Sequence, residues 1–129
     1  MPNTVEYIGE NAFMDCKSLK NVKLSNKLDK IAIGTFCRCY SIRSISIPNG
    51  VEIIGNSAFS GCLSLCEISI PSSVKQLQDG VLYESKSLVR INYSGTVEEW
   101  NNVEKGKEWD YGTPQYTVYC NDGIVKKSN

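Results

Sequence analysis

The chain has 129 residues, enough for one domain with its own hydrophobic core. Its 14 basic and 14 acidic side chains cancel, which leaves no net charge to attract a nucleic acid or an anionic membrane. Histidine is absent, so the commonest general base and the commonest metal ligand are both missing. We therefore expect no enzymatic activity, no cofactor and no metal site.

A pattern with a period of 23 residues begins near the N-terminus and runs to residue 93. Each copy carries an Ile-Gly pair, an Ala-Phe pair, a Gly-Cys pair and a Ser-Leu pair, or close substitutes for them. The phased copies span residues 5–19, 28–42 and 51–65, with a looser fourth copy over 74–88. One such unit cannot bury its apolar positions alone, whereas stacked units can, so the period predicts a solenoid of four repeats.

Each repeat ends in a short stretch where every second residue is apolar, such as Ile45 and Ile47. A period of two is typical of a half-buried strand, and Pro48 ends the strand because proline cannot donate to a sheet. A second apolar pair, Val51 and Ile54, predicts a short extended segment on the opposite side. The Ala-Phe pair then begins a tight turn or a short helical turn that carries the cysteine.

Stacking in phase turns equivalent residues into columns, with parallel strands roughly 4.8 Å apart. Phe13, Phe36, Phe59 and Leu82 form one predicted column, and Val22, Ile45, Ile68 and Ile91 form another.

Cys16, Cys39 and Cys62 also share one phase. Their Cα atoms would lie about 5 Å apart, within the range that a disulfide tolerates. Stacked side chains point the same way, however, and the middle thiol could serve only one neighbour. We expect reduced, buried thiols, with a disulfide as the alternative.

The period breaks after residue 93. Thr96 and Glu99 form a capping-box pattern, which predicts a helix with Val97, Trp100 and Val103 along one face. An alternating strand over 116–120 and an Asn-Asp-Gly turn follow it. The sequence thus predicts repeats over residues 1–93 and an α+β capping segment over 94–129.

The motif "IP..V..IG..AF.GC.SL..I.I" over residues 2–93 resembles the BspA-like, or Treponema-type, leucine-rich repeat. The resemblance implies a right-handed α/β superhelix with a parallel sheet. It also implies a non-enzymatic module that attaches bacteria to host proteins or to one another. A cell-surface or extracellular location is expected, but the chain begins without a signal peptide, so a cytoplasmic location stays open.

Met1 falls in phase with Leu24, so the chain opens in the middle of a repeat. We hypothesise that it is the C-terminal fragment of a longer array. The alternative is a short protein that covers its uncapped N-terminal edge by self-association.

The outward strand positions form the predicted concave binding face for a protein partner, whether a host extracellular-matrix protein or a bacterial surface protein. These residues are Asn21, Lys23, Ser44, Ser46, Glu67, Ser69, Arg90 and Asn92. Their columns contain no aromatic residue, so a spacer without a ligand of its own is an alternative.

A third hypothesis is carbohydrate binding by Trp100, Trp109 or Tyr111 in the capping segment.

Overall fold

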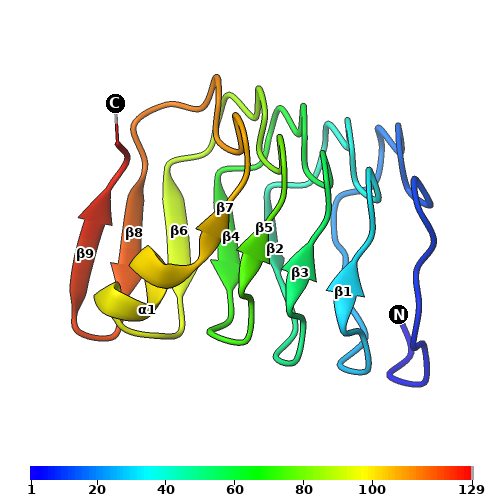
Figure 1. The fold of residues 1–129 in the computed structure, drawn as a ribbon. Helices are drawn as coiled ribbons and strands as arrows, with labels where there is room; N and C mark the ends of the chain where they lie inside the picture. The colour runs from blue at the N-terminus through cyan, green and yellow to red at the C-terminus, as the bar shows by residue number, and fades with distance from the viewer. Residues whose placement is uncertain (129) are drawn as a thin grey trace.

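The computed structural model describes residues 1–128 as a solenoid whose coils stack one after another from the N-terminus to the C-terminus (Figure 1). Two sheets line two of its sides. The first sheet contains β1 (Lys30–Ile31), β3 (Ile53–Ile54), β5 (Gln76–Leu77) and β7 (Glu104–Lys105). The second contains β2 (Ser44–Ser46), β4 (Glu67–Ile70), β6 (Arg90–Tyr93), β8 (Thr117–Cys120) and β9 (Gly123–Lys126). The predicted fold class, a leucine-rich-repeat solenoid with a parallel sheet, is confirmed.

The sequence period sets the register of the second sheet. Ile45 of β2 lies beside Ile68 of β4, and Ile68 lies beside Ile91 of β6, as the columns predict. Val118 of β8 extends this column by one more strand. All four side chains are buried, so the strands, although only two to four residues long, are fixed by a continuous apolar core.

The third side of each coil is a turn, not a helix. Within each turn two residues four positions apart have positive φ, for example Gly34 (φ 64°) and Arg38 (φ 56°). A backbone ladder joins successive turns, with the N–H of Phe36 donating to the carbonyl of Ala58 (2.9 Å) and equivalent bonds above and below. Inside the turns, the rings of Phe13, Phe36 and Phe59 are stacked with centroids 5.4 Å apart, as the phenylalanine column predicts.

Side-chain hydrogen bonds connect the cysteine column, Cys16, Cys39 and Cys62, to the same turns. The thiol of Cys62 donates to the carbonyl oxygen of Phe36 at 3.1 Å, and the thiol of Cys39 bonds the carbonyl of Phe13 in the same way. Ser85, which departs from the repeat pattern, donates its hydroxyl to the carbonyl of Phe59 at 2.6 Å. A serine therefore replaces cysteine here without loss of the bond.

All six cysteines are free thiols in the structure, and their burial differs. Cys39 and Cys62 are buried, Cys16 is half-buried and Cys66 is exposed. Burial raises the pKa of Cys39 to about 11 and that of Cys62 to about 12. Cys39 and Cys62 are therefore poor nucleophiles at neutral pH.

The helix α1 (Val97–Asn102) begins at the predicted capping box. The Thr96 hydroxyl accepts from the N–H of Glu99 (3.1 Å), and the Glu99 carboxylate accepts from the N–H of Thr96 (3.0 Å). At the other end, the Lys105 ammonium donates to the carbonyls of Trp100 (2.7 Å) and Val103 (3.0 Å). Groups at both ends of this short helix are thus satisfied by side chains.

The segment after residue 93 adds a further coil to the solenoid. α1 lies between β6 and β7 along the chain. β7 then pairs with β5 in the first sheet, and β8 pairs with β6 in the second (Figure 1). The chain then turns back, and β9 pairs antiparallel with β8. Because the segment continues both sheets, it extends the surface of the repeats as well as closing their core.

The first coil differs from the others. The strand predicted around Val22 and Leu24 is not formed, although Leu24 is buried and Val22 half-buried. The coil is held to the second by the turn ladder and by the ion pair between Asp15 and Arg38 (2.6 Å). An end coil has a neighbour on one side only, so fewer hydrogen bonds hold an extended strand there.

Candidate binding face

The eight predicted outward residues lie on one surface, which we call the outer face. It comprises the outward side of the second sheet and the adjoining segment of the first coil. None of the eight residues is buried, and the register places Glu67 beside Arg90 and Ser69 beside Asn92. Outward residues at equivalent positions of successive repeats therefore lie side by side.

The C-terminal half of the outer face is a connected polar network. The Arg90 guanidinium donates to the Asn92 side-chain oxygen through Nε (2.7 Å). The Asn92 amide in turn donates to the Glu67 carboxylate (2.8 Å) and to the Ser69 hydroxyl (3.3 Å). Asn92 therefore links Arg90 to Glu67, and the four side chains are held in defined positions.

Tyr119 of β8 adds an aromatic residue to this network. The Arg90 guanidinium carbon lies 3.9 Å from the centroid of the Tyr119 ring, a cation–π contact, and 40% of Tyr119 is exposed. Ile124 of β9, 54% exposed, is the register partner of Tyr119. Both residues lie beyond the fourth repeat, where the predicted face ends, so neither was predicted from the sequence. The alternation of apolar and other residues over 116–120 could have revealed Tyr119, because it places Val118 inward and Tyr119 outward.

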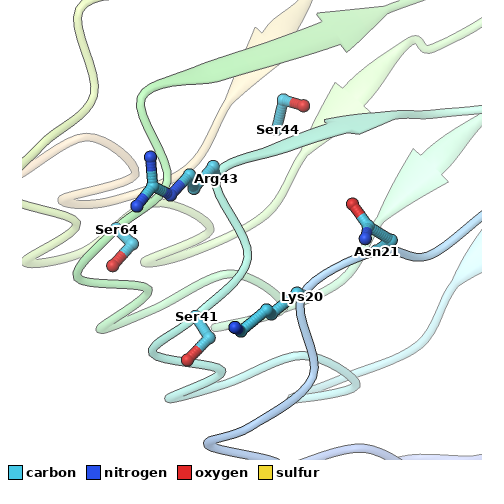
Figure 2. A pocket seen from close by; sticks show the side chains of 6 residues that line it. All are labelled: Lys20, Asn21, Ser41, Arg43, Ser44 and Ser64. Atoms are coloured by element: carbon cyan, nitrogen blue, oxygen red, sulfur yellow. The ribbon is translucent and has the colours of Figure 1, made fainter.

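The N-terminal half of the outer face is hollowed. A groove of about 650 Å³ runs between the first coil and β2, and four predicted residues line it: Asn21, Lys23, Ser44 and Ser46. Beside it, where β2 begins, lies a pocket of about 350 Å³ (Figure 2). Lys20, Asn21, Ser41, Arg43, Ser44 and Ser64 line this pocket. The groove and the pocket share Asn21 and Ser44, so they form one recessed region.

Most aromatic rings of the capping segment face the core. Trp100 is only 3% exposed and packs edge-to-face against Tyr93 and Trp109, and Trp109 packs in the same way against Tyr116. Besides Tyr119, Tyr111 is an exception, since it is 54% exposed and stacks on Tyr83 on the turn side of the solenoid. The two tryptophans thus belong to a packed cluster that closes the solenoid.

Among residues 1–128, no three acidic, cysteine or histidine side chains gather closely enough to hold a metal ion. The described part of the chain likewise contains no helix with the length and apolar character needed to span a bilayer.

The repeat geometry agrees with the match to known proteins. The family model described as BspA type Leucine rich repeat region (6 copies) matches residues 1–103. The chain belongs to this family. No curated protein matches the chain.

Three solved bacterial structures resemble this solenoid. A leucine rich cell surface protein from Faecalibacterium prausnitzii is 36% identical, with a TM-score of 0.79, over 81% of this chain and 27% of its own. The leucine rich repeat protein of T. pallidum is 24% identical, with a TM-score of 0.69, over 92% and 57% of the two chains. A leucine-rich repeat protein from Bacteroides ovatus is 22% identical, with a TM-score of 0.56, over 93% and 37%. This chain spans between about a quarter and just over half of these proteins.

Proposed function

We propose that the outer face binds a protein partner, and that the chain is a non-enzymatic recognition module of a bacterial cell-surface or secreted protein. The observation that carries the proposal is the contact of Arg90 with Tyr119, held in place by Asn92. Tyrosine and arginine are enriched among residues that dominate the binding energy of interfaces.

The arrangement suits recognition because its side chains are already ordered. Arg90 is fixed by one hydrogen bond and one ring contact, and Asn92 by two further bonds. A side chain that is ordered before binding loses less conformational entropy on binding. Arg90 and Lys126 give this end of the outer face two cationic groups, so a partner with acidic groups beside an apolar one fits it.

One relative supports the cell-surface location, and the family resemblance alone motivates the choice of partner class. The relative from Faecalibacterium prausnitzii is described as a cell surface protein. Resemblance to BspA-like proteins favours a host extracellular-matrix protein or a surface protein of another bacterium as the partner. The spacer hypothesis shares the fold and differs only in predicting no partner. For the carbohydrate hypothesis, Trp100 is buried and Trp109 packs edge-on against it, which leaves Tyr111 as the one clearly exposed ring of the three.

A binding panel tests the proposal. Purified chain is passed over immobilised fibronectin, laminin and collagen and over intact bacterial cells, and Arg90→Ala is compared with Lys30→Ala. Lys30 is an exposed cation on the first sheet and serves as a charge-matched control. We expect at least one surface to bind the native chain and the Lys30 variant, with binding at least about tenfold weaker for Arg90→Ala. Absence of binding across the panel supports a spacer.

A further inference from the structure

The pocket at the start of β2 has the composition of an anion site. Two of its six lining residues, Lys20 and Arg43, are cationic and none is acidic. Figure 2 shows Lys20 extending from the first coil toward Ser41, while the Arg43 guanidinium lies on the side of Ser64. Two cations that share a recess of about 350 Å³ produce a locally positive potential in a neutral chain.

Neither cation is neutralised by the rest of the described chain. The two ion pairs within residues 1–128 join Arg38 to Asp15 and Lys86 to Glu84, and neither Lys20 nor Arg43 uses its side chain in a hydrogen bond there. The contrast with Arg38 is direct, because Arg38 lies on the same coil as Arg43 and meets a carboxylate through two nitrogens, at 2.6 and 2.9 Å. Arg43 therefore has a free planar fork of donors.

A hydroxyl group in the pocket is also unused. Serines recur in one phase of the repeat, and two of them donate to the preceding coil: Ser41 to the carbonyl of Lys17 and Ser87 to that of Leu63, both at 2.6 Å. Ser64 occupies the same phase and lines the pocket, but its hydroxyl has no partner in the described chain. It is free to donate to a ligand.

We propose that this pocket binds a tetrahedral oxyanion, the phosphate or sulfate group of an ester. A guanidinium fork can meet two oxygens, and the Lys20 ammonium and the Ser64 hydroxyl can meet others. A carboxylate has only two oxygens and would leave part of this donor set without a partner. Glu67, the register partner of Ser44, is the nearest acid in the sheet register, and its carboxylate is held by the Asn92 amide.

The site lies apart from the proposed binding centre on the outer face, since neither Arg90 nor Tyr119 lines the pocket. The test is a titration of ¹⁵N-labelled chain with sodium sulfate and, separately, sodium phosphate, each at constant ionic strength against sodium chloride. We expect saturable shifts of the Arg43, Ser44 and Ser64 amide resonances with both anions. Sodium acetate at the same ionic strength should give clearly weaker shifts, and an equal response to acetate would overturn the tetrahedral assignment.

Variants locate the site. Arg43→Gln and Lys20→Gln are each expected to weaken binding at least about tenfold, because each removes a charge-assisted contact. Ser64→Ala should weaken it severalfold. Lys27→Gln, at an exposed lysine that does not line the pocket, and Arg90→Gln should bind as the native chain does. Shifts no larger than those in sodium chloride, or unchanged binding by Arg43→Gln, would overturn the proposal. None of the variants changes a buried residue, and their native fold is checked from the unchanged dispersion of the amide spectrum.

Discussion

The guanidinium of Arg90 lies over the ring of Tyr119, with 3.9 Å between its central carbon and the ring centroid. The two residues come from the last regular repeat and from the strand after the inserted helix, and they meet because β8 continues the parallel sheet. The contact creates the best candidate for a binding centre on the outer face. It is exposed, so it should matter more for recognition than for folding.

The first prediction separates these two roles. Replacing Arg90 with alanine should lower the free energy of unfolding by no more than about 1 kcal/mol, since exposed cation–π contacts contribute about that much. Urea unfolding followed by circular dichroism measures the change. A loss of several kcal/mol would mean that Arg90 is a structural residue, and its effect on binding would then not identify a recognition surface.

The phenylalanine column should dominate stability. Phe36 is fully buried between two stacked rings, so Phe36→Ala should cost about 3–5 kcal/mol. Phe59→Leu copies the residue that the fourth repeat carries naturally, Leu82, and should cost less than about 1.5 kcal/mol. Urea midpoints measure both changes. Equal losses of unfolding free energy in the two variants would contradict the claim that the phenylalanine column is the main source of stability.

Serine should replace cysteine in the thiol column at little cost. Because Ser85 makes the same hydrogen bond as Cys62, Cys62→Ser should retain the bond to Phe36 and stay within about 1 kcal/mol of the native chain. Cys62→Ala loses the bond and leaves a small cavity, so it should be the less stable variant. Cys66→Ser, at an exposed site, is the control. The reverse order of stability would show that the hydrogen bond is unimportant.

Alkylation should discriminate among the thiols. With pKa values of about 11 and about 12, Cys39 and Cys62 are ionised to roughly one part in a thousand and one part in ten thousand at pH 8. Exposed Cys66 should react first with iodoacetamide, and Cys39 and Cys62 only after unfolding. Peptide mass mapping over time measures the order. Modification of Cys62 at the rate of Cys66 in the native chain would contradict its burial.

High pH should destabilise the C-terminal coil through Tyr116. Its hydroxyl donates to the Asp110 carboxylate at 2.7 Å, and burial, together with this carboxylate, raises its pKa well above the ordinary value near 10. Because the folded state holds this proton more tightly, the stabilisation is complete below pH 10 and decreases as pH rises beyond it. Tyr116→Phe should lower stability at neutral pH and flatten this dependence, whereas Tyr111→Phe, at an exposed ring, should leave it unchanged.

The repeats were predictable because their period determines the register. A column such as Ile45, Ile68 and Ile91 can bury its side chains in only one phase, and the capping box of Thr96 and Glu99 depends on four consecutive residues. The position of Tyr119 was harder to predict because α1 interrupts the period between β6 and β8, so the phase of β8 cannot be counted from the repeats. The free hydroxyl of Ser64 depends on atomic distances within the coils, which a repeated serine does not reveal.

The most direct test of the recognition face compares two exposed tyrosines. Tyr119 lies on the outer face and Tyr111 on the turn side, so Tyr119→Ala and Tyr111→Ala remove the same group from different surfaces. Surface plasmon resonance against the matrix protein or bacterial surface that binds the native chain should show at least about tenfold weaker binding for Tyr119→Ala. Tyr111→Ala should bind as the native chain does. Equal binding by the native chain and Tyr119→Ala, or a loss confined to Tyr111→Ala, would contradict recognition through the outer face.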